Sequence, residues 1–329
     1  MKIAIKDLRE KILEVLSKNM NEEDSNIVAD YIIWAEMTGN KTQGITKLTG
    51  ESPIQYIVPD YNLKIERETP VSALLDGGKN PAIVVADKAL EIVSKKAKEF
   101  GMAIVGARNT FSSNGAQSYY VEKLAKQDLI GIMVSRSPGT VSAFNSIDPL
   151  FGTNPIGFAF PTNDEPIVFD AATSAMTFYG LVVAKAHGQQ IPEGIATDKN
   201  GNVTTDPAEV IAGGAVTPFG NSYKSAGLSM LVELLSGPLI NGAYLDYQTY
   251  DKEWGTTFIA INPNILVDVD KFKTSCSEFV SIIRNSRTKK DEQIYMPHDR
   301  SRKSYNNCLK SGFVEVDDVI YNEVFNNTK

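Results

Sequence analysis

The segment NKTQGITKL, residues 40–48, places Gln43 beside Gly44, with Lys47 three residues further on, where an expected helix ends. The amide of Gln43 can donate and accept hydrogen bonds, but it cannot release a proton near neutral pH. Loops that follow helices often carry side chains toward ligands. The segment is therefore either a polar exit from a helix or the reacting end of an active site. On these residues alone both interpretations stay open.

The stretch FDAATSAM, residues 169–176, combines an expected strand end with a possible helix start. The strand is expected to end at Asp170, and Thr173 or Ser174 could cap the helix that follows. Free backbone N–H groups at such a helix start can bind a phosphate or another anion. The alternative is a plain strand-to-helix connection without a ligand.

Lys224 precedes another helix, which is expected to begin near Ala226. The helix dipole disfavours a lysine at the N-terminal end unless an anion lies between the two positive charges. Lys224 is therefore either a phosphate partner or an ordinary solvated lysine.

The elements that must position these segments follow from the hydrophobic pattern. Apolar residues recur at helical spacing over residues 5–18, and a second amphipathic helix follows with Asn21 as its N-cap and Asp24 at the capping-box offset. Helices and buried strands then alternate: helix 86–100 ended by Gly101, strand 102–107, polar loop 108–115, helix 116–127 and strand 129–135. This βαβ-like rhythm predicts an α/β sheet.

The second half of the chain continues the same pattern with one interruption. We expect strands 152–161 and 165–170, helix 174–186, a loop-rich excursion over 188–223, an apolar helix 227–240, strand 255–263 and helix 270–286. Asp317 or Asp318 is expected to cap a short last helix.

Composition excludes several classes of protein. The 329 residues are 42% hydrophobic and 22% charged, which is typical of a soluble globular protein, and the net charge of −7 argues against a nucleic-acid surface. Two cysteines, Cys276 and Cys308, and two histidines, His187 and His298, are too few for a disulfide framework or an ordinary zinc site. With no signal-peptide pattern and no apolar run of membrane-spanning length, we expect a cytoplasmic protein without a metal or a membrane partner.

The sequence contains no G-x-G-x-x-G after a strand and no Walker A motif, so a standard Rossmann site is not expected. The motifs nevertheless resemble, in order and spacing, those of the type 2 malate/L-lactate dehydrogenase family. That family includes ureidoglycolate, sulfolactate and diketogulonate oxidoreductases and Δ1-piperideine-2-carboxylate reductases. The matching stretches are LFGTNPIGFAFP, FDAATSAM, IPEGIATDKNGNVTTDP, GGAVTPFGNSYKSAGLSMLVELLSGPLI and, more weakly, GNKTQGITKL. The residues of these motifs are most similar to those of the cyclic ketimine reductase branch.

The resemblance implies a mixed-sheet α/β fold that binds NAD or NADP without the Rossmann fingerprint. It also implies a homodimer with the active site near the dimer contact. Carried over by position, the cofactor contacts are Asp170, Ala171, Ala172, Thr173, Ser174, Ala175, Met176, Tyr223 and Lys224. A further contact is implied at His298, where the family usually reads Pro-Gly-Glu and this chain reads Pro-His-Asp.

The resemblance also shows what has changed at the reacting end. The family reads Ser-His-Gly with an arginine three residues after the glycine, whereas this chain reads Thr42-Gln43-Gly44 and Lys47. The family's histidine donates a proton or orients the substrate, and its arginine holds the substrate carboxylate. Lys47 keeps the positive charge but loses the two-pronged fork of arginine.

A second family histidine is also replaced, here by Ser112 or Ser113. Arg136, in an expected loop after strand 129–135, could supply the missing carboxylate clamp, since some family members place a basic residue there. Reduction of a carbonyl needs a proton donor, and a positioned acid contributes about 10²–10⁴-fold to such a reaction. With both family histidines replaced, Lys47, Tyr119 and Tyr120 are the remaining candidate donors.

We therefore expect an NAD(P)H-dependent oxidoreductase that reduces the C=O or C=N of a 2-oxo acid or a cyclic 2-imino acid. A cyclic imine can arrive already protonated and so needs less help from an acid. The alternative is a nucleotide-binding or regulatory homologue that has lost hydride transfer. Residues 1–115 and 287–329 are expected to form a discontinuous substrate and dimerisation domain, and residues 116–286 the NAD(P)-binding domain.

Overall fold

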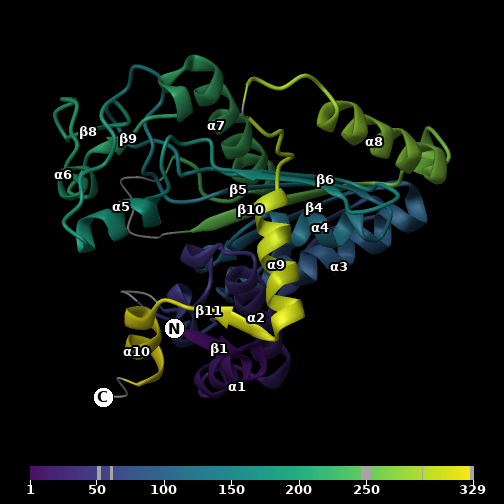
Figure 1. The fold of residues 1–329 in the computed structure, drawn as a ribbon, viewed down its shortest axis with the longest axis horizontal. Coiled ribbons are helices and arrows are strands. Elements are labelled where there is room, and N and C mark those ends of the chain that lie inside the picture. Colours follow the sequence, from purple (N-terminus) through teal and green to yellow (C-terminus); the bar gives the residue numbers. More distant parts are fainter. Residues whose placement is uncertain (50–52, 60–61, 246–252, 291, 327–329) are drawn as a thin grey trace.

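A seven-stranded mixed sheet forms the centre of the computed structural model, which describes residues 1–329 apart from 50–52, 60–61, 246–252, 291 and 327–329. The strand order is β2-β3-β4-β10-β5-β6-β7 (Figure 1). Only β3 and β4 run parallel, and the other neighbours are antiparallel. The strands are β2 (Lys64–Thr69), β3 (Ser72–Asp76), β4 (Met102–Thr110), β5 (Ile130–Arg136), β6 (Ile156–Phe160), β7 (Ile167–Ala171) and β10 (Trp254–Ile261).

Helices cover the sheet unequally. Helices α3 (Ala82–Phe100) and α4 (Ser118–Ala125) pack on one face, and α7 (Tyr223–Ser236) packs on the other (Figure 1). Strand residues such as Val105, Met133 and Phe258 are fully buried in the main hydrophobic core. Burial over consecutive residues is typical of strands covered by helices on both faces, and the expected mixed-sheet α/β fold is confirmed.

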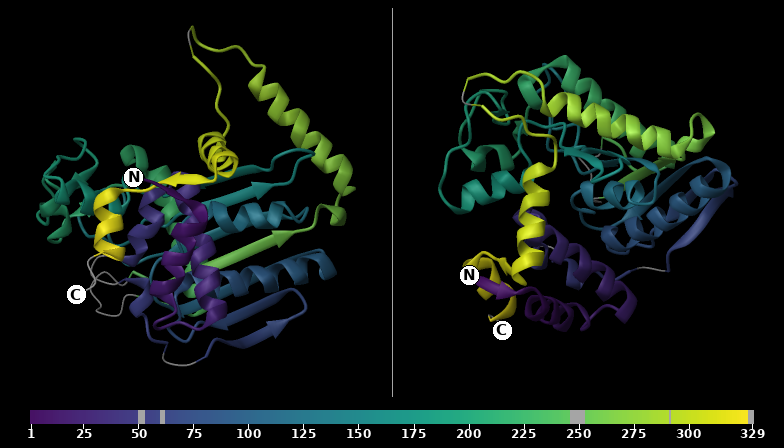
Figure 2. Two further views of the ribbon diagram at one scale, coloured as in Figure 1. Left: turned by 60° about the horizontal axis from the view of Figure 1, so that its bottom comes forward. Right: turned by 45° about the vertical axis from the view of Figure 1, so that its right-hand side comes forward.

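Both ends of the chain contribute to a helical layer beyond α3 and α4 (Figure 2). It contains α1 (Ile5–Leu16), α2 (Glu22–Met37), α9 (Asp299–Ser311) and α10 (Asp318–Phe325), with β1 (Lys2–Ala4) paired to β11 (Phe313–Glu315). The expected caps are present. The side chain of Asn21 accepts a hydrogen bond from the Asp24 N–H, and Asp317 caps α10.

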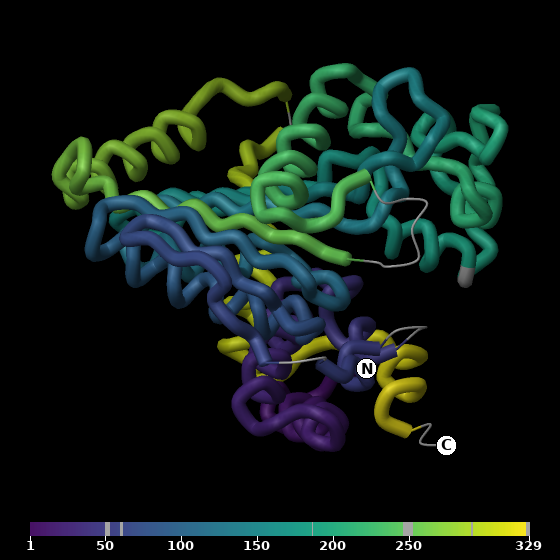
Figure 3. Tube along the Cα trace, turned by 180° about the vertical axis from the view of Figure 1, so that it is seen from behind, coloured from purple at the N-terminus to yellow at the C-terminus, as the bar shows by residue number. Residues whose placement is uncertain are grey.

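The expected excursion over 188–223 carries a small core of its own. Helices α5 (Phe178–Ala186) and α6 (Pro207–Ile211) and the short pair β8 (Ala196–Thr197) and β9 (Ala215–Val216) gather at one end of the molecule (Figure 3). Leu181, Ile191, Val210 and Val216 are buried there, so this excursion is ordered around an apolar cluster.

The sheet differs from the sequence expectation at two places. The hairpin β2–β3 was not predicted, because all six residues of β2 are exposed and carry no apolar alternation. β4 continues to Thr110, beyond the expected loop boundary at 108, since it pairs there with Trp254 of β10. The sheet also runs across the expected domain boundary at 115/116, so the domain division stays a prediction.

Within the described ranges, no helix is long and apolar enough to cross a membrane. The same ranges hold no group of three or more histidine, cysteine or acidic side chains arranged for a metal ion.

Candidate functional site

The segment after α2 folds into two consecutive 3₁₀ turns, Lys41–Gln43 and Ile45–Leu48, joined at Gly44. Lys47 lies on the second turn with only 8% of its surface exposed. Its Nζ donates one long hydrogen bond, 3.3 Å, to the carbonyl of Ser113. Burial lowers the pKa of Lys47 to about 7. Among the described residues, no carboxylate forms an ion pair with Lys47.

Two further polar atoms of this region are buried without a partner. They are Oε1 of Gln43 and Oγ of Ser112, and neither has a hydrogen bond within the described part of the chain. Ser112 takes a positive φ of 67°, which is uncommon for a residue with a side chain. Buried polar atoms normally find partners, so these two atoms are available to a water molecule or a ligand.

The structure thus brings three of the four expected catalytic residues to one place. We call residues 41–48 together with 112–113 the substrate turn. Gln43 and Lys47 come from the end of α2, and Lys47 contacts the residue next to Ser112. A cation, a hydroxyl and an amide oxygen in one buried region can hold a small carboxylate and one neighbouring polar atom.

The loop that carries Ser112 is held from both sides. Asn114 donates 2.8 Å hydrogen bonds to Ser135 Oγ and Thr256 Oγ1, and Tyr120 donates from its hydroxyl to the Asn114 carbonyl at 2.8 Å. The N–H of Ala116 donates to the hydroxyl of Tyr31 at 2.6 Å. These hydrogen bonds fix the loop to the sheet and to the helical layer. They therefore limit the positions that Ser112, just before them in the chain, can take.

The tyrosines are poorer proton donors than expected. Burial raises the pKa of Tyr120 well above its usual value, and its hydroxyl is already engaged with Asn114. Burial also raises the pKa of Tyr119, whose ring lies under the Lys123 ammonium at 4.1 Å. Lys47, with a pKa near neutrality, is the candidate best matched to the pH of a cell.

Arg136 differs from its expected place. It is the last residue of β5 rather than part of a loop, and it is 1% exposed. Its Nε donates to Glu233 Oε1 at 3.0 Å, and its Nη1 and Nη2 donate to the carbonyls of Glu253 and Ser137. A role as substrate clamp stays a prediction that this pairing disfavours.

Glu233 is the centre of a buried polar network that joins β5, α7 and the segment after β7. Its Oε2 accepts a hydrogen bond from Asn154 at 2.8 Å. The carbonyl of Asn154 accepts from the Thr173 hydroxyl at 3.0 Å, which itself accepts from Ser229 at 2.8 Å. We call these residues and Arg136 the Glu233 network. It holds one expected cofactor residue, Thr173, in place.

The expected cofactor segments lie side by side. The Ala175 N–H donates to the Thr217 carbonyl at 2.9 Å, and the Phe219 N–H donates to the Thr173 carbonyl at 3.0 Å. Ser174 also forms a β-bridge with Pro218. The stretch from 173 to 175 is thereby placed against the segment that leads into Tyr223 and Lys224, both of which are exposed.

The helix starts in this region differ from the expectation. Thr177, not Thr173 or Ser174, caps α5 by accepting from the Gly180 N–H at 3.1 Å. The hydroxyl of Ser174 instead donates to the Met176 carbonyl. α7 begins at Tyr223 rather than near Ala226, because Ser222 caps it through the Lys224 N–H at 3.1 Å.

Asp170 is tied to the start of α4. Its Oδ2 accepts from the N–H and hydroxyl of Ser118 at 3.0 and 3.1 Å, and burial raises its pKa. Ala171, the last residue of β7, pairs with Ile156, and Ala172 and Met176 are half-buried.

The residues around α7 fit a dinucleotide phosphate. Lys224 is exposed and forms no ion pair among the described residues, beside the free N–H groups of the first turn of a 14-residue helix. Gly220 takes a φ of +64° and has open space where a side chain would begin. An NAD(P) phosphate could approach the backbone at that glycine and pair with Lys224.

His298 is not joined to these segments by any hydrogen bond or ring contact among the described residues. It precedes α9 with a φ of +70°, and its Nε2 lies 3.9 Å from Glu122 of α4. Its ring stacks on Trp34 of α2, with 6.4 Å between centroids. Burial lowers its pKa. Its role as a cofactor contact stays a prediction.

Sequence reasoning missed Glu36 and Glu233, which organise the two polar regions. Each is an acidic residue inside an otherwise apolar helical run, YIIWAEM and LSMLVELL. A carboxylate at a position that must be buried needs a partner. That mismatch was the available signal.

Comparisons with known proteins identify the family of the chain. The profile of the malate/L-lactate dehydrogenase family matches residues 3–324. The chain is 34% identical over 332 residues to the malate/(S)-sulfolactate dehydrogenase of Methanothermus fervidus, covering 96% of this chain and 94% of the relative. The crystal structure of malate dehydrogenase from Entamoeba histolytica has a TM-score of 0.90 at 26% identity, covering 98% of this chain and 96% of that one.

A match of another kind covers part of the chain. The chain is 37% identical over 199 residues to the Delta(1)-pyrroline-2-carboxylate/Delta(1)-piperideine-2-carboxylate reductase of Pseudomonas putida, covering 57% of this chain and 56% of the relative. Membership of the cyclic ketimine reductase branch, which the motif residues suggested, therefore stays a prediction. The expected enzyme class, an NAD(P)-dependent dehydrogenase or reductase, is confirmed. The chain belongs to the malate/L-lactate dehydrogenase family.

Proposed function

We propose that this oxidoreductase reduces the C=O or C=N bond of a small 2-oxo or cyclic 2-imino carboxylic acid. The observation that carries the proposal is the buried Lys47, which forms no ion pair among the described residues and donates to the carbonyl of Ser113. Gln43 in the preceding turn and Ser112 next to Ser113 each have a buried polar atom without a partner. An uncompensated buried cation is costly unless an anion arrives to pair with it. A substrate carboxylate is such an anion.

Lys47 would hold the carboxylate, and Ser112 would donate its unused hydroxyl to the substrate. Gln43 bears on the choice of substrate, because its buried oxygen can only accept a hydrogen bond. A ketone oxygen offers no donor to that atom. A protonated cyclic imine offers its N–H, and it also brings the proton that reduction of the C=N bond requires. The buried oxygen of Gln43 is the feature that supports the cyclic imino acid, whereas the Ser112 hydroxyl could donate to either substrate class.

Bound NAD(P)H supplies the hydride. Lys224 and the first turn of α7 would hold a phosphate of that cofactor, with the segment from 170 to 176 beside it. The Glu233 network keeps Thr173 against α7, so these two cofactor segments move as one unit.

The functional unit we propose is a cytoplasmic homodimer. Four apolar side chains of α7, Leu228, Met230, Leu231 and Leu234, are each 38–53% exposed. Helix α8 (Val269–Arg284) stands off the sheet and buries none of its side chains, although Phe279 and Ile282 are apolar (Figure 2). Exposed apolar surface of this extent on a helix next to a site supports a subunit interface.

The test is fluorescence titration with NADH and NADPH, followed by turnover with pyruvate, oxaloacetate and Δ1-piperideine-2-carboxylate. We expect saturable nucleotide binding that weakens about tenfold in Lys224→Glu, consistent with a reversed charge at a phosphate. We expect the imino acid to be turned over fastest.

The alternative, a nucleotide-binding homologue without catalysis, rests on the replacement of both family histidines by Gln43 and Ser112. Nucleotide binding without turnover of any of the three acids would establish that alternative. Failure to bind either nucleotide would overturn the reductase proposal altogether.

A further inference from the structure

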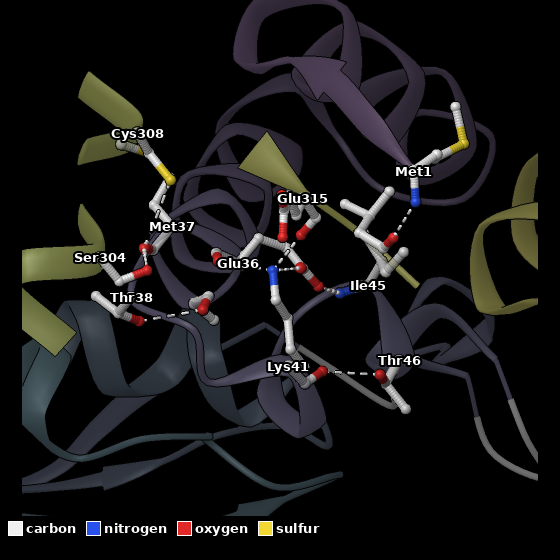
Figure 4. A network of polar contacts seen from close by, with 12 residues as sticks. Met1, Glu36, Met37, Thr38, Lys41, Ile45, Thr46, Ser304, Cys308 and Glu315 are labelled. Atoms are coloured by element: carbon white, nitrogen blue, oxygen red, sulfur yellow. Dashed lines mark hydrogen bonds and ion pairs between the residues drawn. The ribbon is translucent and has the colours of Figure 1, made fainter. Parts of the chain in front are cut away.

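The carboxylate of Glu36 lies against Lys41 and Ile45 of the substrate turn (Figure 4). Its side chain is 1% exposed. Oε1 accepts a hydrogen bond from the Ile45 N–H at 2.8 Å, and Oε2 accepts one from Lys41 Nζ at 2.9 Å. One carboxylate therefore binds both 3₁₀ turns, the first through Lys41 and the second through the backbone of residue 45.

Gly44 allows this approach. A side chain at residue 44 would begin 1.9 Å from Glu36 Oε1, closer than any real contact. The N–H of Lys47 donates to the Gly44 carbonyl at 3.0 Å, so the second turn starts at the point where the carboxylate presses against the backbone. The glycine is required by packing against Glu36, since its backbone angles are not in the left-handed region.

Lys41 braces the same carboxylate from the other side. Its Nζ also donates to the carbonyls of Glu36 and of Glu315 in β11 (Figure 4). Thr46 donates from its hydroxyl to the Lys41 carbonyl at 2.8 Å, which closes the two turns on each other. The arrangement is thus linked to the C-terminal strand, which pairs with β1.

We propose that Glu36 is a positioning residue whose carboxylate, braced by Lys41, holds Lys47 against the loop that carries Ser112. The two oxygens of the Glu36 carboxylate are engaged by Lys41 and the Ile45 N–H, so its proposed action on the substrate is indirect. A misplaced charge costs much of its benefit even when the shift is small. The proposal rests on the proposed function only in taking Lys47 as the carboxylate anchor.

The test is a double-mutant cycle between Glu36→Gln and Lys47→Met. Glu36→Gln keeps an oxygen acceptor but loses the charge that holds Lys41. We expect it to raise KM for the imino acid at least tenfold while the NADH dissociation constant stays within twofold. In the Lys47→Met background the same change should alter KM less than twofold, because there is no anchor left to misplace. Glu10→Gln, at an exposed carboxylate on α1, is the matched control.

Equal fold-losses in both backgrounds would overturn the proposal, because Glu36 would then act independently of Lys47. A parallel loss of NADH binding would also overturn it, since that indicates general damage to the fold. Where Glu36→Gln fails to fold, Lys41→Gln, which keeps a donor to Glu36, takes its place in the cycle.

A readout without turnover separates this proposal from the function itself. Competitive acetylation of lysines with trace acetic anhydride, followed by mass spectrometry, reports the titration of Lys47 in each variant. We expect Lys47 to titrate near neutral pH in the unmodified protein and closer to 10 in Glu36→Gln, as the turn releases the amine to water. An unchanged titration would sink the positioning role, whatever acids the enzyme reduces.

Discussion

The substrate turn and the Glu233 network are two buried polar regions of one molecule, and they differ in how completely their groups are paired. In the Glu233 network, the guanidinium of Arg136 and both carboxylate oxygens of Glu233 have protein partners. In the substrate turn, Lys47 has one long hydrogen bond, and two neighbouring polar atoms have none. Lys47 and Arg136 are both buried, so exposure of these two cations does not explain the difference.

The comparison teaches which buried charges belong to the fold and which to a ligand. A fully paired network stabilises one packing of the chain and offers nothing to a substrate. A partly paired one costs stability until a ligand completes it. By this criterion we assign Arg136 to the fold and propose Lys47 for the site, although the sequence made both candidates for the same carboxylate.

The largest expected effect comes from breaking the paired region. Arg136→Met should destabilise the protein by about 3–5 kcal/mol, because it leaves the carboxylate of Glu233 buried without its cation. Urea unfolding at pH 7 measures this. Lys6→Met, which removes an exposed ion pair with Glu10, should cost under about 1 kcal/mol.

The double variant Arg136→Met/Glu233→Leu should recover much of the lost stability, because it removes the stranded charge as well. If Arg136→Met keeps full stability and loses only substrate affinity, Arg136 is a substrate clamp after all and the comparison fails.

Breaking the unpaired region should have opposite effects on stability and activity. Lys47→Met removes a buried cation that has no carboxylate partner, so the free energy of unfolding should rise by about 1–3 kcal/mol. The same change should lower kcat/KM for the imino acid by about 10²–10³-fold, through loss of a charge-assisted contact. Urea unfolding and steady-state kinetics measure the two effects on one preparation.

Lys185→Met, at an exposed lysine of α5, is the control for stability and should change it by under about 0.5 kcal/mol. A Lys47→Met protein that is both less stable and fully active would show that Lys47 is an ordinary part of the core.

The lowered pKa of Lys47 predicts a dependence on pH that a permanently charged arginine would not give. Above the pKa of about 7, the amine of the free enzyme loses its proton, so KM for the carboxylate should rise about tenfold per pH unit. Initial rates between pH 6 and 9 measure this rise, which should be absent in Lys47→Arg. A flat KM in the unmodified enzyme would contradict it.

The lowered pKa of Lys47 also predicts how the free energy of unfolding changes with pH. Between pH 7 and the ordinary lysine value of 10.5, the unfolded chain binds a proton that the folded chain does not. The Lys47 contribution to stability should therefore rise with pH across that window, by up to about 1.4 kcal/mol per unit. Urea unfolding of the protein and of Lys47→Met at pH 7 and 9 isolates this contribution, since only the former should gain it.

The sequence predicted the fold more completely than the site. Strands such as β5 and β10 are buried over several consecutive residues, so each appears in the sequence as a short apolar run. The β2–β3 hairpin was missed because β2 is exposed on both faces. A strand held mainly by backbone pairing at a sheet edge leaves no apolar pattern to detect.

The roles of the candidate site residues stay predictions, and the sequence did not indicate which charges are paired. Gln43, Lys47 and Ser112 became candidates through their positions in the motifs. The sequence could not show that Arg136 has a carboxylate partner and Lys47 has none among the described residues. The partner of Arg136 is Glu233, which lies 97 residues away in sequence. Which buried charge finds a partner is decided by tertiary packing, and no local pattern records it.

The smallest expected effect concerns Gln43, whose buried amide oxygen has no partner among the described residues. Gln43→His restores a group that can both accept a hydrogen bond and give up a proton near neutral pH. We expect turnover of a 2-oxo acid such as oxaloacetate to rise about tenfold, less than the roughly 10²–10⁴-fold of a fully positioned acid. The rate should fall as pH rises through the histidine pKa, because only the imidazolium can donate.

Turnover of the cyclic imine should change little in Gln43→His, since that substrate brings its own proton. Parallel assays of the two substrates from pH 5.5 to 8.5 measure the ratio. Gln43→Asn, which keeps the amide but shortens it, is the control and should not improve the oxo acid. Equal gains on both substrates would mean that residue 43 acts by packing. The buried oxygen of Gln43 would then say nothing about which substrate the enzyme prefers.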